Sequence, residues 1–578
     1  MRKRLTLVVW LKAVFLYGIT LTVCLPIAAQ IAWVNESISP ETAYQRLQQT
    51  GELNDAVITG AFDLARLTQD TDNPEAATSY HISNVVFTGP VTLLRHELDV
   101  DIRIQNSQFE HAIHMQQCGL QRFILSESTL SGELVVRDCT FNGSNRFNDN
   151  RFHSTVQFHI STFLHNPSFR NAVFSDRVEF LECEFGHHAP ARKAVSFANA
   201  VFNGPAIFNR SHFLTPAKFQ SVRFSQDASF LNTRFESDAS FRNVHFMGDA
   251  EFRFCEIGSA DFGDRDNLTL FAQRADFRGC QMNSARFDTT EFRGETSFVD
   301  TVFGAGGASF RYANFGHNKA DFFGIKIDTE GLLDFSQANV TAMHFYWQEI
   351  RRPFLATHPD SRILAAFLSR LKAIGDTQGA LDVSYHLENQ KFLESIATPL
   401  PDANRESMAF LDAAGQRFIL YTERIVWGLP TGYGTKSGRI LLIALVLWLV
   451  SALPVMLKGS ILARIPCNRG GNTASPDGSA KIYQSVQLAA HSTTAQFPAS
   501  RYEHTMMAFL FTFRILFKIG SNTIRYVVQT PNSEKSLVNW KHYFATLWLL
   551  GSLLLILMGL TFANTSPIIS KLVGELLV

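Results

Sequence analysis

The stretch Thr431-Gly-Tyr-Gly434 has the most specific chemical pattern in the chain. A Gly-Tyr-Gly run can form a potassium filter, because its stacked backbone carbonyls replace the water shell of the ion. Such a filter needs a pore helix before it and a spanning helix on each side. This stretch instead precedes both long apolar segments near the end of the chain, and between those segments the chain reads Ile519-Gly-Ser-Asn-Thr, without Tyr-Gly. We therefore interpret residues 431–434 as a tight elbow that needs glycine for its backbone angles.

Histidine and cysteine, which are common metal ligands, occur close together at His111, His114 and Cys118. In a strand the two histidines point to opposite faces, which argues against a shared metal ion. His187 and His188 lie in an interruption of the repeat pattern, and we interpret them as part of a surface loop. The sequence therefore predicts neither a metal site nor a cofactor.

The seven cysteines are scattered singly and form no Cys-x-x-Cys pair. This spacing argues against a disulfide framework and against a zinc site. Cys183 and Cys255 stand two residues before Phe185 and Ile257, where small residues stand elsewhere in the repeat. We interpret both cysteines as small core residues.

Asp99 and Asp101 could imitate the paired carboxylates of β-helical enzymes that cleave polysaccharides, because their spacing places both on one strand face. No third partner is identifiable, and the sequence contains no phosphate-binding loop and no nucleophile elbow. We predict no catalytic, cofactor-binding or metal-binding residues and no enzymatic activity. A carbohydrate-active β-helix enzyme is kept as an alternative.

A regular spacing of phenylalanine determines the elements that carry these residues. Steps of five and six residues alternate, and two positions before each ring stands a small residue. The small residue and its ring point the same way, because side chains alternate across a strand. A helix cannot bury every fifth or sixth residue on one stripe over this length. The spacing predicts a β-solenoid in which rings stack on rings. The unbroken series is Phe197, Phe202, Phe208, Phe213, Phe219, Phe224, Phe230, Phe235, Phe241, Phe246 and Phe252.

The solenoid is predicted to fill residues 80–347, with interruptions at 186–194 and 263–274. At about 22 residues a coil it would hold roughly a dozen coils, stacked about 4.8 Å apart. Residues 34–79 are predicted to form an N-terminal cap and the first coil. A short helix over 40–51 would cover the unpaired edge that every solenoid end exposes.

Motifs such as Ala-Ser-Phe at 228–230 and Ala-Asp-Phe at 275–277 resemble the repeats of the pentapeptide-repeat family. The family consensus is a small residue, Asp or Asn, Leu or Phe, and two variable residues. The resemblance implies a right-handed quadrilateral β-helix. This chain departs from the consensus in two ways: every second repeat has six residues, and the middle position is seldom Asp or Asn.

The apolar spacing becomes helical after the solenoid. Asp360 can cap one helix and Asp376 a second, and Gly375 separates them. Residues 348–400 therefore predict a helical hairpin that closes the solenoid end or binds a partner. A juxtamembrane helix and the elbow are predicted over 401–438.

Two apolar segments, 439–458 and 542–564, are each about long enough to cross a bilayer. The connection between them, 459–541, is predicted to be a cytoplasmic loop, because residues 458–541 hold ten Lys or Arg and three acids. A short tail, 565–578, follows the second segment.

Within this basic loop, residues 467–502 are rich in Gly, Ser, Thr and Ala, and we predict that they are disordered. Residues 506–528 are apolar but punctuated by basic residues, which predicts a helix lying on the inner leaflet. At the other end of the chain, residues 1–33 have the basic start and apolar core of a signal peptide or an N-terminal membrane anchor. Either would send the solenoid out of the cytoplasm.

The segments Trp347-Gln-Glu-Ile350, Leu371-Lys-Ala-Ile-Gly-Asp376 and the Thr-Gly-Tyr-Gly elbow followed by Arg439 extend the resemblance. They are similar to the segments after the solenoid in membrane-bound pentapeptide-repeat proteins of prokaryotes. Some of those relatives end in a two-helix, potassium-channel-like module. The resemblance implies a degenerate ion-channel-like membrane module in this chain.

These observations predict a mainly β fold: a β-solenoid followed by an α-helical hairpin and a transmembrane helical region. We expect a membrane-anchored scaffold or binding protein of the prokaryotic cell envelope, in the inner (plasma) membrane with its solenoid on the extracytoplasmic side. The expected partners are the lipid bilayer and a protein on the solenoid surface or hairpin, with a homo-oligomer as a further option. The zero formal net charge argues against nucleic acid. The alternative is an ion-channel-like or transport-associated membrane protein regulated by the solenoid.

Overall fold

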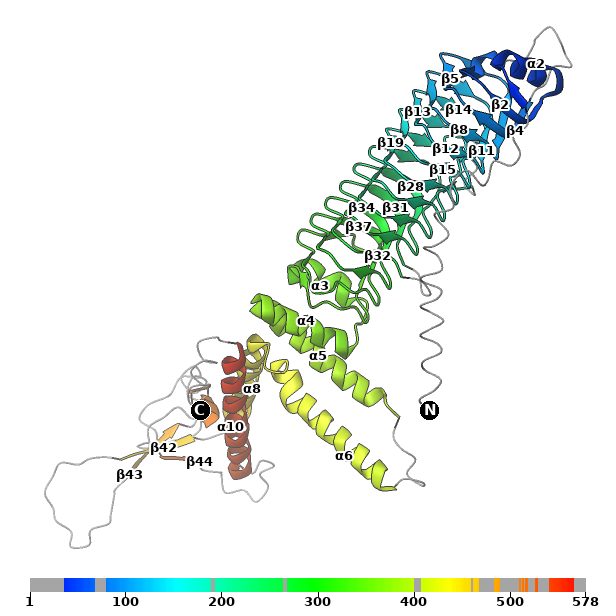
Figure 1. Cartoon of the computed structure of the whole chain (residues 1–578). Helices are drawn as coiled ribbons and strands as arrows, with labels where there is room; N and C mark the ends of the chain where they lie inside the picture. Colours follow the sequence, from blue (N-terminus) through cyan, green and yellow to red (C-terminus); the bar gives the residue numbers. More distant parts are fainter. Residues whose placement is uncertain are drawn as a thin grey trace, which may run out of the picture. The chain divides into compact units, whose positions relative to one another are not determined.

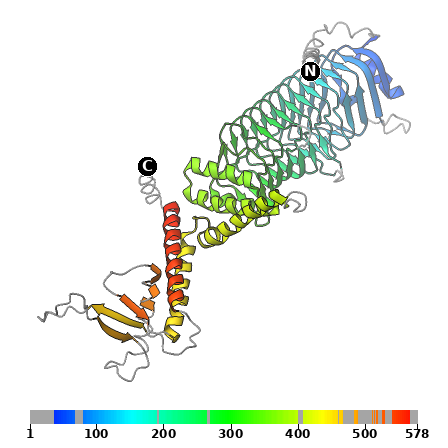
Figure 2. The same cartoon turned by 90° about the horizontal axis from the view of Figure 1, so that it is seen from below.

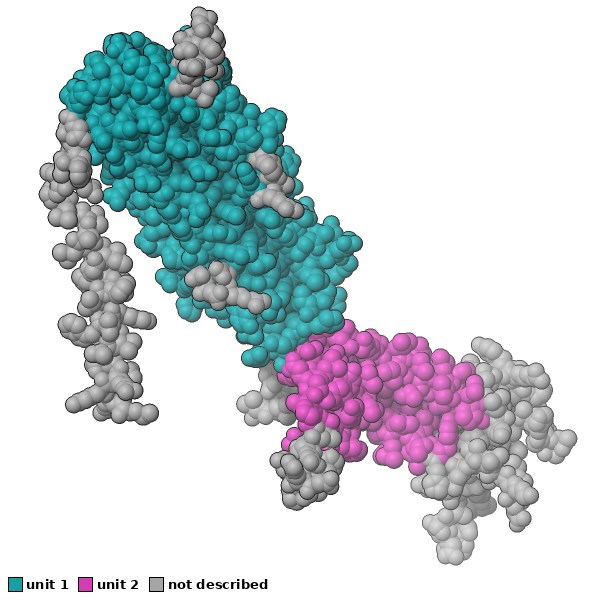
Figure 3. Space-filling model, turned by 90° about the vertical axis from the view of Figure 1, so that its right-hand side faces the viewer, with its two compact units in different colours: residues 1–374 teal, residues 375–578 magenta. Residues whose placement is uncertain are grey.

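The computed structural model divides the chain into two compact units, residues 1–374 and 375–578 (Figure 3). The residues it describes are 36–67, 79–188, 193–263, 268–399, 407–458, 461–466, 483–488, 509–510, 512–513, 515–517, 525–528 and 540–565. The predicted N-terminal segment 1–33 and the tail after residue 565 lie outside the described residues.

The first unit is a stack of short parallel strands, and the strands of successive coils pair in register (Figures 1 and 2). Each full coil has four sides, which we call the first to fourth faces in chain order. The third face alone is a sheet of 13 strands, which corresponds to the dozen or so coils predicted. The mainly β solenoid is confirmed.

Strands of the first face are β7 (Asp101–Gln105), β11 (Phe123–Ser126), β21 (Val195–Ser196), β25 (Ala217–Lys218) and β40 (Leu333–Asp334), together with the starts of β2 (Glu52–Ile58) and β4 (Ser79–Phe87) and the ends of β28 (Arg234–Ser240), β31 (Glu256–Asp261), β34 (Gln281–Arg286) and β37 (Val302–Ser309). Strands of the second face are β1 (Glu36–Ile38), β2 (Glu52–Ile58), β4 (Ser79–Phe87), β8 (Gln108–Phe109), β12 (Thr129–Leu130), β15 (Arg151–Phe152), β18 (Val173–Phe174), β22 (Val201–Phe202), β26 (Arg223–Phe224), β29 (His245–Phe246), β32 (Leu270–Phe271) and β35 (Glu291–Phe292).

Strands of the third face are β3 (Phe62–Asp63), β5 (Val91–Leu94), β9 (Ile113–Gln116), β13 (Leu134–Arg137), β16 (Val156–His159), β19 (Val178–Leu181), β23 (Ala206–Ile207), β27 (Ala228–Ser229), β30 (Ala250–Glu251), β33 (Ala275–Asp276), β36 (Thr296–Ser297), β38 (Ala320–Asp321) and β41 (Met343–His344). Strands of the fourth face are β6 (Glu97–Leu98), β10 (Gly119–Leu120), β14 (Thr140–Phe141), β17 (Thr162–Phe163), β20 (Glu184–Phe185), β24 (His212–Phe213) and β39 (Lys326–Ile327), with the starts of β28, β31, β34 and β37 between the last two.

The core consists of four columns of stacked rings, one behind each face. In the column behind the first face, the Phe219 ring lies 5.0 Å from Phe197 and 4.9 Å from Phe241, with interplanar angles of 5° and 7°. Neighbouring columns meet edge to face, as Phe219 and Phe230 do at 5.5 Å and 89°. Both arrangements are favourable for aromatic pairs. The small residue two positions before each ring is also buried, as Ala217 and Ala228 illustrate, because it points inward beside its ring.

Two kinds of corner explain why the ring spacing alternates between five and six. After the first and third faces, the chain makes a turn whose third residue has a positive φ, as at Asn199 (61°) and Arg210 (57°). In the first of these turns the Ala200 N–H donates to the Phe197 carbonyl oxygen at 3.0 Å, which is the bond that closes a β-turn. These tight corners give steps of five residues, and the other two corners give steps of six.

The helix predicted to cap the N-terminal end is confirmed. α2 (Pro40–Thr50) begins at Ser39, whose Oγ accepts from the Thr42 N–H at 3.2 Å, and it ends at Gly51 with a φ of 74°. The Tyr44 ring stacks on Phe62 at 4.7 Å, so α2 closes the ring columns at this end. The first coil also contains a short 3₁₀ helix, η2 (Leu64–Arg66).

The C-terminal end of the solenoid is closed by α3 (Trp347–Leu355) and α4 (Ser361–Ile374). The Phe367 ring of α4 lies 5.6 Å from Phe335 and 5.4 Å from Phe345 of the last coils. Trp347 is buried beside it. Asp360 caps α4 as predicted, accepting from the Ile363 N–H at 2.9 Å. Closure of the solenoid end thus involves α3, which the helical spacing did not indicate.

The second unit begins with α5 (Thr377–Ala397), whose Asp376 cap accepts from the Gly379 N–H at 2.8 Å. The predicted break lies at Gly375, where φ is 81°. Both predicted helices of the 348–400 region are therefore present, while their arrangement as a hairpin stays a prediction. The unit continues with α6 (Ser407–Glu423), the π-helix η3 (Arg424–Gly428), α7 (Leu429–Thr431), α8 (Ser437–Lys458) and α10 (Trp540–Thr565).

One helix of the described part of the chain is long and apolar enough to cross a membrane: α10, over Ala545–Ala563. The apolar part of α8, Gly438–Pro454, is shorter. Side chains of the two helices share a buried cluster, which also contains a residue from the helical positions between 509 and 517. The cluster comprises Ile440, Ala444, Leu516, Leu547, Leu554 and Leu557.

Two predictions for the basic loop 459–541 are wrong in part. β42 (Ile461–Pro466) pairs antiparallel with β43 (Tyr483–Leu488) and β44 (Arg525–Val528). β43 falls in the stretch predicted to be disordered, and its Tyr and Val are residue types that favour strands. β44 replaces the end of the interfacial helix predicted over 506–528, because Tyr526-Val-Val528 also favours a strand over a helix.

Candidate functional site: polar ladders on the solenoid

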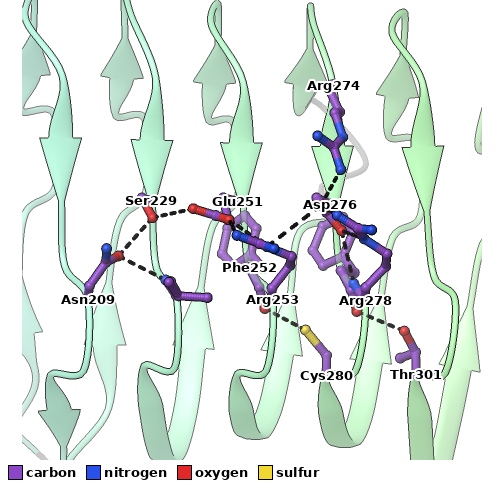
Figure 4. Close-up of polar contacts among 12 residues, drawn as sticks. Asn209, Ser229, Glu251, Phe252, Arg253, Arg274, Asp276, Arg278, Cys280 and Thr301 are labelled. Carbon is purple, nitrogen blue, oxygen red and sulfur yellow. Dashed lines mark hydrogen bonds and ion pairs between the residues drawn. The ribbon is translucent and has the colours of Figure 1, made fainter.

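Many outward strand positions carry polar side chains, and in-register pairing places these side chains in ladders. On the third face, Ser229, Glu251 and Asp276 follow one another on successive coils (Figure 4). The Ser229 hydroxyl lies 2.8 Å from Glu251 Oε2, and Arg253 Nε donates to Glu251 Oε1 at 2.5 Å. The ladder thus binds neighbouring coils through their side chains as well as their backbones.

Asp276 is the most enclosed acid in this ladder, with a side chain that is 5% exposed. Arg278 donates to it from Nε at 2.8 Å and from Nη2 at 2.6 Å, and Arg274 donates from Nη2 at 2.6 Å. Burial alone would raise the pKa of Asp276, but the hydrogen bonds from Arg278 and the charges of both arginines outweigh it and hold the pKa below its usual value. Such a carboxylate stays ionised, so it is a poor proton donor and a good structural anion.

The first face carries a groove of about 580 Å³ that extends over β25, β28, β31, β34 and β37. Within it Arg242 Nε lies 2.5 Å from Asp261 Oδ2, and Arg286 Nε lies 3.8 Å from Asp261 Oδ1. Farther along, Arg311 Nε lies 3.8 Å from Asp334 Oδ2. The groove is therefore polar and of mixed charge. Its smaller lining residues include Ala217, Ala239, Ser240, Ser259, Ser284, Gly306 and Ser309.

A second groove, of about 520 Å³, lies at the other end of the same face, beside β7 and β11. It is lined by Tyr80, Asp101 and Arg122 among others, and the last two form an ion pair with Nη1 and Oδ2 3.2 Å apart. The first face is thus hollowed near both ends of the solenoid.

Buried hydroxyl and thiol groups occupy the small position before each ring of the fourth face. The Cys280 thiol donates to the Phe252 carbonyl oxygen at 2.7 Å, and the Thr301 hydroxyl donates to the Phe277 carbonyl oxygen at 2.8 Å (Figure 4). Burial raises the pKa of Cys183 to about 12, so this thiol stays protonated and unreactive. The column contains Cys118, Cys139, Ser161, Cys183, Ser211, Thr233, Cys255, Cys280 and Thr301, which confirms Cys183 and Cys255 as small core residues.

The histidines singled out in the sequence do not converge with Cys118. The side chain of His114, on β9, is exposed, whereas Cys118 is buried in the column just described. His111 precedes β9, and His187 and His188 are exposed after β20. Within the described ranges, no three His, Cys, Asp or Glu side chains are close enough together to hold a metal ion.

The shared strand predicted for Asp99 and Asp101 is absent. Asp99 lies between β6 and β7, and only Asp101 belongs to a strand. The chain turns a corner there, so alternation along one strand does not apply to this pair. Asp101 is instead paired with Arg122.

Residues Thr431–Gly434 form an elbow between α7 and α8, as predicted. Gly432, Tyr433 and Gly434 have φ values of 61°, 56° and 78°, a run of left-handed residues that glycine makes accessible. The Thr431 Oγ1 accepts from the Gly434 N–H at 2.9 Å. The Tyr433 ring lies against Gly428, where an added Cβ would come within 2.7 Å of the ring.

With this geometry established, the solenoid can be compared with known proteins. Residues 208–256 match the family model described as pentapeptide repeats (9 copies). These residues are therefore similar to pentapeptide repeats. The match falls on the part of the solenoid with the most regular ring spacing, and the stacked parallel coils agree with it. Comparisons with curated proteins and with solved structures gave no significant match.

Sequence reasoning missed the first-face groove and the arginine clusters of the third face. A signal for both exists, because residues one coil apart become neighbours in a solenoid. Aligning the chain on its rings places Ser240, Asp261, Arg286 and Ser309 in one row, and the register of β28, β31, β34 and β37 is the same. Opposite charges in adjacent coils would have indicated the ion pairs.

Proposed function

We propose that this protein is a membrane-anchored solenoid that binds a protein partner at the prokaryotic cell envelope and has no catalytic activity. The groove on the first face is the observation that carries the proposal. Its arginines and aspartates stand at fixed positions on consecutive coils, so a partner with a complementary charge pattern would find a preorganised surface. Electrostatic complementarity of this kind favours specific encounter.

The rest of the solenoid supports binding rather than chemistry. Glu251 and Asp276 of the third face are engaged with arginine, and the described thiols are buried. The core of stacked rings makes a rigid support, because every coil packs on both neighbours. Residues Ala545–Ala563 of α10 are long and apolar enough to serve as a membrane anchor.

Binding can be tested by affinity purification from native membranes. The double variant Lys218→Glu/Arg286→Glu reverses the charge at two positions of the first face. The control variant Arg223→Glu/Lys326→Glu makes the same change in net charge on the second and fourth faces. We expect the first variant to lose the co-purifying protein and the second to retain it. Equal retention by both variants would overturn the first face as the binding surface.

The predicted orientation can be tested by protease shaving of intact cells and spheroplasts, with tags before residue 40 and within 467–502. We expect cleavage of the solenoid from outside and protection of the loop, in agreement with the basic residues of 458–541. Protection of the solenoid with exposure of the loop would invert the orientation.

A channel-like function is a second candidate, favoured by one observation. Leu516 is buried, and its carbonyl oxygen would lie 2.0 Å from a Cβ added at Gly551, near the middle of α10. The Trp448 Nε1 of α8 also donates to the Phe509 carbonyl oxygen at 2.9 Å. A short helical segment that packs against two apolar helices at mid-height is what a pore module requires. Potassium flux in vesicles reconstituted with the full chain, compared with empty vesicles, tests this function.

A further inference from the structure

The segment α6, η3 and α7 (yellow in Figure 1) exposes several large apolar side chains. Its large side chains are well exposed, from Phe418 at 74% to Val426 at 37%. Spacings of three, four and seven residues place them on one side of a helix. We call Phe418, Ile419, Ile425, Val426 and Leu429 the apolar stripe.

Charged side chains of the same segment lie toward α5. Arg417 and Glu423 line a hollow of about 630 Å³ together with Glu388 and Lys391 of α5. The Arg424 guanidinium lies 4.2 Å from the centre of the Phe392 ring of α5. A surface helix in water normally buries its apolar side and exposes its polar one. The arrangement here is reversed, which indicates an apolar environment outside the protein.

The apolar stripe adjoins the apolar helices of its unit. Its last member, Leu429, begins α7, which contacts both α8 and α10. After the elbow, α8 continues with exposed apolar residues such as Leu442 (61%) and Val450 (63%). Lys436 lies at the junction, with its Nζ 4.3 Å from the centre of the Tyr385 ring. Cations and aromatic rings at the start of a spanning helix mark the membrane interface.

We propose that the apolar stripe lies in the interfacial layer of the bilayer that α8 and α10 enter, with Phe418 and Ile425 facing the acyl chains. The proposal rests on the membrane anchoring proposed above and deepens it, because it assigns a lipid-contacting surface to a segment outside the apolar helices. A helix in this layer buries its apolar side among lipids and turns its polar side away from them. α6 would thereby fix the height of the elbow relative to the membrane.

The test uses the full chain in native membranes, with the photo-cross-linker benzoylphenylalanine placed at single positions. Phe418 and Ile425 report on the apolar stripe. Ala413, on the polar side of α6 beside the hollow, is the matched control. Leu445, exposed on α8, reports on anchoring itself. After irradiation, intact-mass spectrometry identifies lipid adducts, and gel electrophoresis identifies cross-linked chains.

We expect lipid adducts at Phe418 and Ile425 with a yield at least about fivefold above that at Ala413, and lipid adducts at Leu445. Adducts at Leu445 without adducts at the stripe would overturn this proposal and leave the anchoring intact. Cross-linked dimers at Phe418 in place of lipid adducts would assign the stripe to a second copy of the chain and also overturn it. No adducts at any position would overturn both the anchoring and the stripe.

Discussion

Phe219 is held by two stacked neighbours in its own column and by the edges of rings in adjacent columns. Replacing Phe219→Asp would place a charge between Phe197 and Phe241, where no partner is available and the exposure is zero. We expect a loss of at least about 3 kcal/mol in the free energy of unfolding, because burial of an unpaired charge is costly. Urea unfolding followed by circular dichroism measures this loss.

The matched control for this change is Lys218→Asp, because Lys218 precedes Phe219 and points outward. An outward substitution is expected to change the free energy of unfolding by no more than about 0.5 kcal/mol. Equal unfolding curves for both variants would mean that the inward and outward positions are exchanged in this part of the solenoid.

The tight corners place single residues in a left-handed conformation, and Ile160 is the least suitable of them. Its φ is 51° and its side chain is 62% exposed, whereas equivalent corners use Asn199 and Asn232. A β-branched residue is strained at positive φ, and Asn tolerates it better. We expect Ile160→Asn to stabilise the solenoid by about 1 kcal/mol, measured as a shift of the urea midpoint.

Replacing Ile by Asn within a strand should not stabilise the solenoid. Ile207 lies outward on β23 and is not among the positive-φ residues. We expect Ile207→Asn to leave stability unchanged or lower, because Asn is unfavourable in strands. Stabilisation by Ile207→Asn but not by Ile160→Asn would contradict the role assigned to the corner.

At the scale of elements, the ladder of the third face makes the stability of the coils depend on pH. The pKa of Asp276 is lower in the folded protein than in the unfolded chain, so its contribution is complete above about pH 4 and is lost as the pH falls through the folded value. We expect Asp276→Asn to cost about 1–3 kcal/mol at pH 7. The difference in the free energy of unfolding between the variant and the native protein should vanish at low pH, where Asp276 is protonated. Urea unfolding at a series of pH values measures this difference.

Asp238 provides the control for this experiment, because it is an exposed acid at the edge of the first-face groove. Asp238→Asn should change the free energy of unfolding by less than about 0.5 kcal/mol at neutral pH. A cost for Asp276→Asn that stayed constant from pH 7 to the acid end would show that packing, and not ionisation, accounts for it.

The repeated elements were predictable from the sequence, and the elements formed by contacts that occur only once in the chain were not. The Phe series between Phe197 and Phe252 predicted short strands and stacked rings, because one constraint recurs in every coil. The caps at Asp360 and Asp376 were also predicted, because capping is a local interaction. β42, β43 and β44 were missed, since their pairing joins segments that are far apart in the sequence.

The candidate site also has one part that was predicted from the sequence and one part that was not. The inward column that holds Cys183 and Cys255 could be recognised from position alone. The groove of the first face was missed, because its ion pairs become visible only when outward residues one coil apart are compared. The η3 segment at Arg424–Gly428 likewise has no sequence pattern of its own.

At the scale of the whole molecule, the division into two compact units implies that the solenoid needs nothing beyond residue 374 to fold. Its ring columns end on Tyr44 of α2 and on Phe367 of α4, so both open edges are covered within the first unit. We expect a fragment of residues 34–374 to be a soluble monomer with a β-rich circular dichroism spectrum. Size-exclusion chromatography and thermal melting check this expectation.

The decisive comparison is a shorter fragment, residues 34–346, which lacks α3 and α4. It would expose Phe335 and Phe345, which are buried in the full chain, together with the unpaired edge of the last coil. Exposed strand edges with apolar surface associate with one another. We therefore expect this fragment to form oligomers or aggregates under conditions in which 34–374 is monomeric. If both fragments were equally soluble and melted at the same temperature, α3 and α4 would not be the cap, and the last coil would have to protect its own edge.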